Sequence, residues 1–152
     1  MITIVAIGKM RQKAELELYN RYIKRFKPKL NLIEILEEKG NSTEVRLKEA
    51  QMMLTKIIKR SVVVSLDQAG VNLSSLTFAD NLNRWGYQTN SVVFLIGGAE
   101  GLHRLAIERS NFILSFGNLT WPHMLARIML VEQLYRAQTI LQSHPYHREN
   151  RP

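Results

Sequence analysis

The chain has 152 residues, enough for one domain and too few for a catalytic domain plus a separate recognition module. Hydrophobic residues make up 45% and charged residues 22%, which excludes a disordered chain, and the lack of cysteine excludes disulfides, cysteine-ligated metal centres and a cysteine nucleophile. The formal net charge of +8 favours a polyanion such as RNA as partner, with a merely solvated basic surface as the equally weighted alternative. Neither a membrane span nor a signal peptide is recognisable, so we expect a soluble cytoplasmic protein.

Five short runs rich in β-branched residues predict strands, at residues 2–7, 31–36, 61–66, 91–96 and 111–115. Several of these runs are apolar at consecutive positions, which is typical of strands buried on both faces. Segments with helical periodicity separate them. We therefore expect a single-domain α/β fold, residues 1–152, with a mostly parallel sheet of five to six strands and helices on both faces.

Three helices are expected before the C-terminal one. Apolar faces are formed in the first by Leu16, Tyr19, Ile23 and Phe26, and in the second by Leu47, Ala50, Leu54, Ile57 and Ile58. Asn41 and Glu44 predict a capping box at the start of the second helix. Ser74 or Ser75 is expected to cap a third helix that runs to about Trp85 and ends at Gly86.

The last helix, residues 122–142, is apolar over an unusually wide angle. Pro122 suits its first turn. One face carries Met124, Ile128, Val131 and Tyr135, and a neighbouring face carries Leu130, Leu134, Ala137 and Leu141. We expect the second face to pack against another subunit in a homodimer; the alternative is deeper burial within one chain.

Positive charge is concentrated near the N-terminus. Between residues 9 and 29, eight basic residues face only Glu15 and Glu17: Lys9, Arg11, Lys13, Arg21, Lys24, Arg25, Lys27 and Lys29. Such a cluster raises the local concentration of RNA. Lys24 and Arg25 are our candidates for RNA contacts, and a solvated helix face is the alternative.

Three predicted strands end in loops rich in glycine and small polar residues, namely residues 67–70, 97–101 and 116–121. The carboxyl ends of parallel strands form the usual ligand edge of such a sheet, and glycine lets the backbone approach a ligand closely. The spacing fits neither a dinucleotide fingerprint nor a phosphate loop, so a nucleoside without a polyphosphate fits better. Ordinary turns are the alternative. The four histidines lack helical metal-ligand spacing, so no metal is expected.

The C-terminal segment His144-Pro145-Tyr146-His147-Arg148-Glu149 combines an aromatic ring with basic groups. Such a tail can stack on and hold a nucleobase, and an idle, frayed terminus is the alternative interpretation.

Four blocks of the sequence together resemble one family. Residues 5–9 read VAIGK, 96–102 IGGAEGL, 114–123 LSFGNLTWPH and 144–148 HPYHR, and residues 127–137 continue the pattern with Arg127, Leu130, Glu132, Gln133, Tyr135, Arg136 and Ala137. In content, order and spacing these blocks are similar to the RlmH family of SPOUT methyltransferases. The resemblance covers essentially the whole chain.

The resemblance implies a C-terminal trefoil knot, about residues 61–143, followed by a mobile tail at 144–152. It implies S-adenosylmethionine as methyl donor, S-adenosylhomocysteine as product and no metal. It also implies a homodimer that N3-methylates a pseudouridine in an intersubunit stem-loop of 23S ribosomal RNA, within the assembled 70S ribosome. Alternatives are a SPOUT enzyme acting on another ribosomal or transfer RNA nucleotide, and a non-catalytic ribosome-associated RNA-binding protein.

By position, the resemblance implies cofactor contacts at Leu66, Gly97, Phe116, Gly117, Asn118, Leu119, Thr120 and Trp121. It implies substrate placement and catalysis by Tyr146, His147 and Arg148. The N3 proton must leave before or during attack, so His147 is a candidate general base, Arg148 a candidate for stabilising the anion, and Tyr146 a candidate for stacking.

Glu100 and His123 are further candidates for substrate contact, with structural roles as the alternative for both residues. Two positions depart from the family pattern. Val71 stands where many relatives carry Lys, and Gly117 where many carry a small hydroxyl residue.

Overall fold

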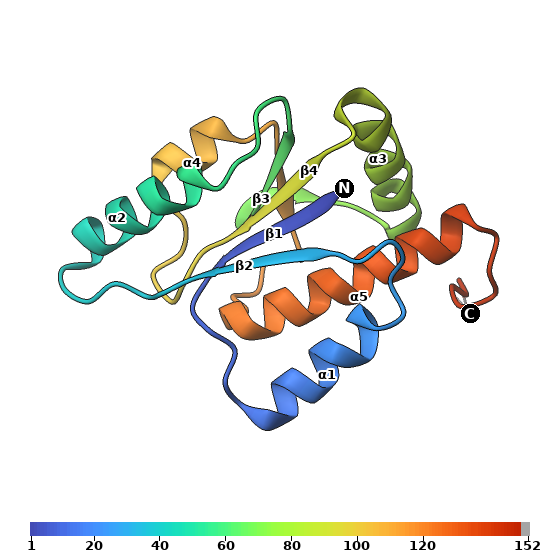
Figure 1. The fold of residues 1–152 in the computed structure, drawn as a ribbon, viewed down its shortest axis with the longest axis horizontal. Coiled ribbons are helices and arrows are strands. Elements are labelled where there is room, and N and C mark those ends of the chain that lie inside the picture. The colour runs from blue at the N-terminus through green and yellow to red at the C-terminus, as the bar shows by residue number, and fades with distance from the viewer. Residues whose placement is uncertain (150–152) are drawn as a thin grey trace.

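The computed structural model describes residues 1–149; residues 150–152, the end of the expected tail, lie outside the described residues. Within residues 1–149 strands and helices alternate (Figure 1). They are β1 (Ile2–Ile7), α1 (Lys13–Ile23), β2 (Asn31–Ile35), α2 (Ser42–Thr55), β3 (Val62–Asn72), α3 (Ser75–Thr89), β4 (Val92–Ile96), α4 (Arg104–Arg109), β5 (Phe112–Ser115) and α5 (His123–Leu141). None of the helices in this part of the chain is long and apolar enough to cross a bilayer.

The strands form one five-stranded sheet in the order β2-β1-β4-β3-β5, and every neighbouring pair is parallel. Helices α1, α3 and α5 cover one face of the sheet, and α2 and α4 cover the other (Figure 1). The predicted parallel α/β architecture is therefore confirmed. Because β4, β3 and β5 are adjacent, their carboxyl ends meet at one edge of the sheet.

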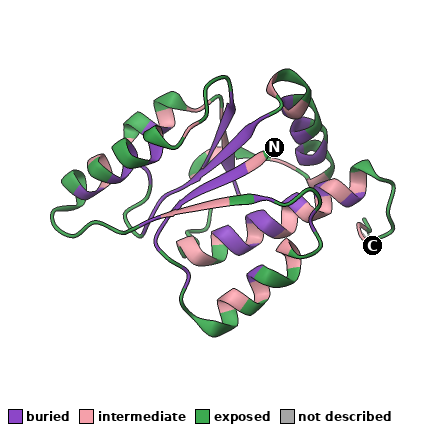
Figure 2. Cartoon of the chain, in the orientation of Figure 1, coloured by how far each residue is buried: buried purple, intermediate pink, exposed green. Residues whose placement is uncertain are grey.

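The hydrophobic core has two layers, one on each side of the sheet (Figure 2). Successive strand residues point to opposite faces. Ile4 and Phe94 accordingly pack under α1, α3 and α5, whereas Val5 and Leu95 pack under α2 and α4. Burial on both sides explains why these strands are apolar at consecutive positions.

The two ends of α3 compare differently with expectation: the predicted C-terminal end is wrong, and the predicted N-cap is confirmed. Gly86 does not end α3, which continues to Thr89. The helix ends at Asn90, whose left-handed φ of 56° supplies the terminating conformation and whose N–H bonds to the Gly86 carbonyl. At its start, Ser74 is the N-cap, because its hydroxyl accepts a hydrogen bond from the Thr77 N–H.

The prediction of which face of α2 is buried is largely wrong, because the buried residues lie on a neighbouring face of the helix. Asn41 does cap the helix, by accepting from the Thr43 N–H. The buried residues, however, are Val45, Glu49, Ala50 and Met53. Ile57 and Ile58 follow the end of α2, and Ile58 is exposed. Ala50 is the one buried member of the predicted face; Leu47 and Leu54 are only half-buried.

The expectation that the second face of α5 packs against another subunit is wrong for most of that face. Leu130, Leu134 and Ala137 are fully buried within the chain, because α5 lies between α1 and α3 as well as on the sheet. Leu141 alone of this face is exposed. A three-sided environment explains a helix that is apolar over such a wide angle.

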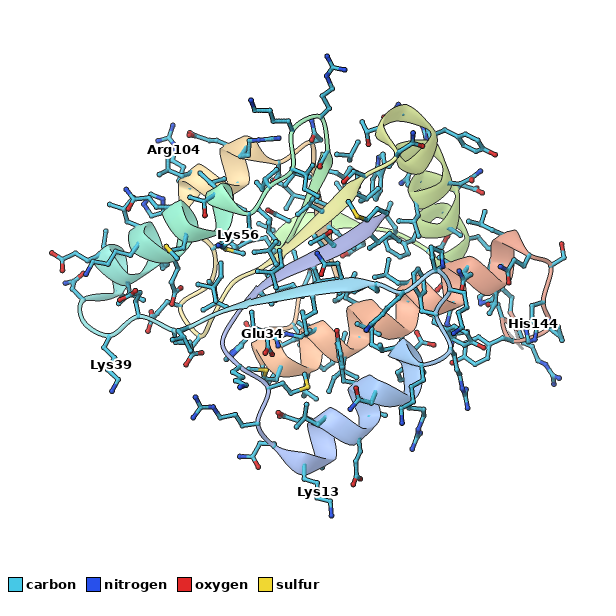
Figure 3. All side chains as sticks on the ribbon, viewed as in Figure 1. Lys13, Glu34, Lys39, Lys56, Arg104 and His144 are labelled. Atoms are coloured by element: carbon cyan, nitrogen blue, oxygen red, sulfur yellow. The ribbon has the colours of Figure 1, made fainter. Side chains whose placement is uncertain are left out.

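Arg127 joins α5 to the carboxyl ends of β1 and β2. Its side chain is completely buried, and its guanidinium donates to the Glu34 carboxylate at 2.7 Å and to the carbonyls of Ile7 and Gly8. Glu34 points from β2 towards α5 (Figure 3). The same Glu34 oxygen accepts from the Met10 N–H, so this one pair holds the turn after β1 against the first turns of α5.

Candidate functional site

A cleft of about 320 Å³ lies at the carboxyl ends of β3, β4 and β5. We call it the loop cleft. Its walls are the three loops that the sequence singled out, and the lining residues are Leu66, Asp67, Gln68, Ile96, Gly97, Gly98, Ala99, Glu100, Gly101, Leu102, Leu114, Phe116, Gly117, Leu119, Thr120, Trp121, His123 and Ala126. The fold thus brings together all the predicted cofactor residues except Asn118, whose carbonyl instead accepts a hydrogen bond from Gln68.

Two glycines shape this cleft. A Cβ on Gly97 would lie 2.7 Å from the Gly101 carbonyl carbon, so only glycine lets the β4 loop fold so tightly. Gly117 has a φ of 109°, a backbone conformation that side-chain-bearing residues rarely adopt and that glycine adopts freely. The other departure from the family pattern, Val71, is 54% exposed and does not line the cleft.

Three glutamates, Glu37, Glu49 and Glu100, lie at or near the loop cleft, and of these only Glu100 lines it among the described residues. His123, the first residue of α5, lies with its Nε2 3.2 Å from the Glu37 carboxylate, so its ring is held by the segment after β2. Glu49 reaches this region from α2 and accepts from the Glu38 N–H. Burial raises the Glu49 pKa, and the nearby Glu37, Glu38 and Glu100 carboxylates add to that shift. Glu100 itself is exposed at the cleft.

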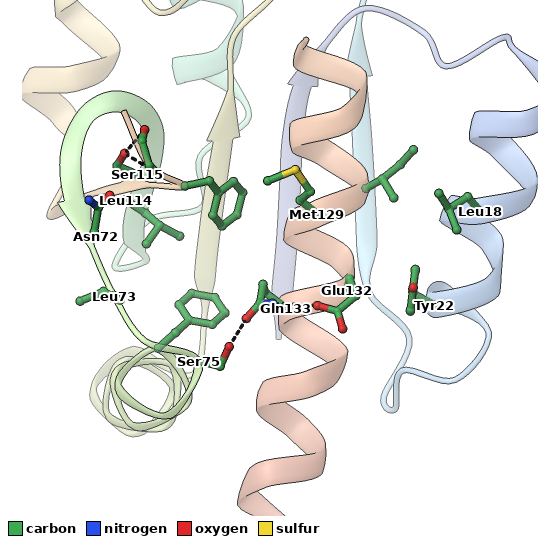
Figure 4. A pocket seen from close by; sticks show the side chains of 14 residues that line it. Leu18, Tyr22, Asn72, Leu73, Ser75, Leu114, Ser115, Met129, Glu132 and Gln133 are labelled. Carbon is green, nitrogen blue, oxygen red and sulfur yellow. Dashed lines mark hydrogen bonds between the residues drawn. The ribbon is translucent and has the colours of Figure 1, made fainter. Parts of the chain in front are cut away.

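A second cavity of about 530 Å³ lies between α1, α5 and the start of α3 (Figure 4). We call it the helix groove. Its wall is mostly apolar, and its polar groups include Glu132 and Gln133 of α5, the latter accepting a hydrogen bond from the Ser75 hydroxyl at 2.8 Å. Phe116 and Gly117 line both this groove and the loop cleft, so the two cavities adjoin.

The C-terminal segment folds back on α5 beside the helix groove. The Tyr146 hydroxyl donates to Glu132 at 3.1 Å, and its ring packs edge-on against Tyr135 and under the Arg136 guanidinium. Arg136 also binds Glu132 in a fork and lies 3.3 Å from His147 Nδ1. Burial and the Glu132 carboxylate raise the Tyr146 pKa to about 12, and the same carboxylate raises the Arg136 pKa.

Within one chain this tail does not reach the loop cleft. Its partners are Glu132 and Arg136, whereas the α5 residues that line the cleft are His123 and Ala126. The predicted catalytic residues Tyr146 and His147 therefore lie near each other, beside the helix groove and outside the loop cleft of their own chain. Arg148 is exposed.

Lys24 and Arg25 are exposed at the end of α1, on the tail's side of the molecule. The turn that follows them is tied to α5 by a hydrogen bond from the Lys27 N–H to the Gln138 side chain. The adjacent Tyr22 is close enough to influence the Tyr146 pKa. The predicted RNA-contacting residues and the predicted tail site thus lie at one end of α5.

Sequence reasoning missed Glu132 and Arg136 as site residues, although both belong to the family pattern. The signal available was their i, i+4 spacing, which places an acid and a base next to each other on one face of a helix. It also missed Glu49 and Gln68, whose partners are far away in sequence. Within residues 1–149, no three acidic or histidine side chains are grouped closely enough to hold a metal ion.

A family model described as "Predicted SPOUT methyltransferase" matches residues 1–147. The chain is also 44% identical over 149 residues to ribosomal RNA large subunit methyltransferase H of Gluconacetobacter diazotrophicus, an alignment that covers 98% of each protein. This chain belongs to the RlmH family of SPOUT methyltransferases. The family resemblance inferred from four short blocks is therefore confirmed over nearly the whole chain.

Solved structures give the same fold at low sequence identity. A methylase family protein from Haemophilus influenzae Rd KW20 matches with a TM-score of 0.58 and 14% identity, covering 99% of this chain and 71% of that one. A methyltransferase from Legionella pneumophila, solved in complex with S-adenosylmethionine, matches with a TM-score of 0.50 and 15% identity over 90% of this chain and 66% of that one. At such identities the match establishes the architecture alone.

Proposed function

We propose that this protein is an S-adenosylmethionine-dependent methyltransferase of large-subunit ribosomal RNA. The observation that carries the proposal is 44% identity, over 98% of the chain, to a protein of that name. The loop cleft supports it independently, because three separate loops of the sequence converge on one cavity of a size suited to a small ligand.

The residues of the loop cleft fit this cofactor. Leu66, Leu102 and Leu114 offer apolar surface for a flat base, and the tightly folded loop around Gly97 and Gly101 presents backbone rather than side chains. When bound, S-adenosylmethionine supplies an activated methyl group, so that the protein's main task is to position the acceptor. We assign the binding to the seven predicted residues that line the cleft: Leu66, Gly97, Phe116, Gly117, Leu119, Thr120 and Trp121.

We further propose, from the family resemblance, that the acceptor is N3 of a pseudouridine in an intersubunit stem-loop of 23S ribosomal RNA, within the assembled ribosome and therefore in the cytoplasm. The tail is the proposed place of substrate contact. Because its pKa is about 12, Tyr146 is neutral at neutral pH and suits stacking or hydrogen bonding rather than proton removal. His147 and Arg148 remain the candidates for taking the N3 proton and stabilising the resulting anion.

A homodimer is the proposed assembly. The docking of the tail on Glu132 and Arg136, outside the loop cleft of its own chain, supports an active site built from the cleft of one subunit and the tail of its partner. Large apolar side chains exposed beside the cleft, Leu119, Trp121 and Leu125, support coverage by a second subunit. The mass measured by light scattering at micromolar concentration tests this, and a monomer would contradict it.

We also propose the trefoil knot, in about residues 61–143. Its support is the family resemblance. The strand order β2-β1-β4-β3-β5 and the return of α5 between α1 and α3 are compatible with such a path.

The decisive experiment follows the labelled methyl group of S-adenosylmethionine into intact ribosomes, separated subunits and naked ribosomal RNA from cells lacking this protein. We expect label only in intact ribosomes, at one pseudouridine. Label on free ribosomal or transfer RNA would confirm a methyltransferase and show that the proposed substrate is wrong. Absence of label on every RNA would favour a non-catalytic ribosome-associated protein.

Removal of the chain from Tyr146 onwards tests the tail. We expect methyl transfer to be abolished and S-adenosylmethionine affinity, measured by calorimetry, to be retained, because the tail does not reach the loop cleft of its own chain. Mixing this truncated chain with full-length protein impaired in the cleft by Gly97→Ala should restore part of the activity if the site is shared between subunits. Full activity of the truncated protein alone would place catalysis elsewhere.

A further inference from the structure

The loop of residues 116–121 forms one wall of the loop cleft. Phe116 packs against the hydrophobic core, but the residues after it are poorly anchored by apolar packing. Leu119 is 71% and Trp121 41% exposed, and Gly117 places a left-handed residue near its start. Within residues 1–149, most side-chain hydrogen bonds of this loop are local, such as that from Trp121 Nε1 to the Phe116 carbonyl. The conformation of the loop therefore depends on its hydrogen bonds to distant parts of the chain.

Gln68 makes those ties. Its side-chain Nε2 donates to the Asn118 carbonyl at 2.8 Å, and its Oε1 accepts from the Thr120 hydroxyl at 2.9 Å. Its backbone carbonyl accepts from the Ser115 hydroxyl at 3.1 Å. One residue thus contacts the last residue of β5 and two residues of the loop that follows it, some 50 positions later in the sequence.

The geometry of β3 explains why Gln68 can reach this loop. The pairing of β3 with β5 is interrupted between Leu66 and Val71, so residues 67–70 bulge out of the strand. Asp67 stabilises the bulge by accepting from the Ala69 N–H. The bulge carries the Gln68 amide beyond the end of β5, where that strand turns into the loop.

We propose that Gln68 is a positioning residue that clamps the 116–121 loop into its cofactor-binding conformation before the cofactor arrives. The inference rests on the proposed function only in naming S-adenosylmethionine as the ligand. Both segments joined by the clamp line the loop cleft. Without the Gln68 hydrogen bonds the free loop samples more conformations, so cofactor binding must also order the loop and its free energy becomes less favourable.

The test compares wild type with Gln68→Met, which keeps the length of the side chain and removes both side-chain hydrogen bonds. The matched control is Gln51→Met. Gln51 is exposed on α2 and does not line the loop cleft. Hydrogen exchange of the cofactor-free proteins is the first measurement. We expect faster exchange of residues 116–121 in Gln68→Met, no change in the control, and unaltered exchange in the β1 and β4 core.

Calorimetry of S-adenosylmethionine binding is the second measurement. Loss of two neutral hydrogen bonds, both exposed to solvent, predicts a dissociation constant about five- to tenfold higher in Gln68→Met and an unchanged one in Gln51→Met. Thr120→Val should weaken binding less in the Gln68→Met background than in wild type, because its hydroxyl has then already lost its partner. Strictly additive effects would contradict the pairing.

The two measurements separate this inference from the proposed function. Weaker binding with unchanged exchange of the free loop would overturn the clamp, since Gln68 would then act only by touching the ligand. Equal affinities for wild type and Gln68→Met would overturn it as well. A wild-type protein that binds no S-adenosylmethionine would overturn the proposed function, while the exchange data would still decide whether Gln68 orders the loop.

Discussion

Gly97 lies where the backbone of its own loop comes too close for a side chain. In Gly97→Ala the new Cβ would meet the Gly101 carbonyl carbon at 2.7 Å, so the loop must shift. We expect a loss of about 1–3 kcal/mol in the free energy of unfolding, as for other overpacked sites, and strongly weakened S-adenosylmethionine binding. Chemical denaturation and calorimetry measure the two effects.

Gly86→Ala is the matched control for that substitution. Gly86 lies within α3, and a Cβ there would meet no atom within 4 Å. Alanine should stabilise the protein by about 0.5–1 kcal/mol, because glycine loses more backbone entropy in a helix, and cofactor binding should not change. Similar destabilisation by both substitutions would contradict the steric explanation at Gly97.

Tyr146 is the residue whose titration reports on the docked tail. Its pKa is about 12 in the folded chain against 10.0 normally, so the neutral hydroxyl stabilises the docked tail fully below pH 10, and this contribution is lost as the pH rises through 12. In an ultraviolet titration of tyrosinate, Tyr146→Phe should remove one tyrosine from the late phase, and Glu132→Gln should shift it to lower pH. An unchanged late phase in both variants would rule out the contact with Glu132.

At the scale of elements, the position of α5 depends on Arg127. Arg127→Met leaves Glu34 without its ion-pair partner and two carbonyls without their donor. We expect a loss of about 3–5 kcal/mol in the free energy of unfolding, towards the lower end because a quarter of the Glu34 side chain is exposed to water. Adding Glu34→Gln should recover part of the loss, since the unpaired charge is then removed.

Lys13→Ala provides the comparison at an exposed ion pair. Lys13 and Glu17 are 4.0 Å apart in α1 and both are largely exposed, so the stability should change by no more than about 0.5 kcal/mol. Thermal and denaturant unfolding of Arg127→Met, of Arg127→Met with Glu34→Gln, and of Lys13→Ala measures the three changes in stability. If Arg127→Met were as mild as Lys13→Ala, the buried pair would not be what holds α5 to the sheet.

For the molecule as a whole, part of the net charge of +8 is exposed near the tail, where the end of α1 lies beside α5. Lys24→Ala with Arg25→Ala removes two exposed cations on the side of the tail. Ribosome binding should weaken, and the slope of log affinity against log salt should flatten by about 2, since each cation removed leaves one phosphate unneutralised. Unchanged affinity and slope would show that Lys24 and Arg25 form a solvated helix face without RNA contacts.

Much of the fold follows from local pattern. The apolar runs located the strands to within a residue or so, except for the second half of β3, where the bulge at residues 67–70 has the composition of a turn. Helix faces were less predictable: in α2 several faces carry apolar residues, and only packing against α4 and the sheet selects that of Val45 and Met53. The second face of α5 was misassigned for a related reason, since the sequence shows that an apolar face is buried but not by what.

The parallel α/β class, the three loops of the loop cleft and the family could all be predicted from the amino-acid sequence, because β-branched runs, glycine positions and motif spacing are local properties of the chain. Tertiary structure alone decided which distant residues meet. The Gln68 clamp, the Arg127–Glu34 pair and the docking of Tyr146 on Glu132 each join elements whose relative placement is set by sheet order and helix packing. It also placed the tail beside the helix groove rather than in the loop cleft of the same chain, because Tyr146 finds its hydrogen-bond partner at Glu132 of α5.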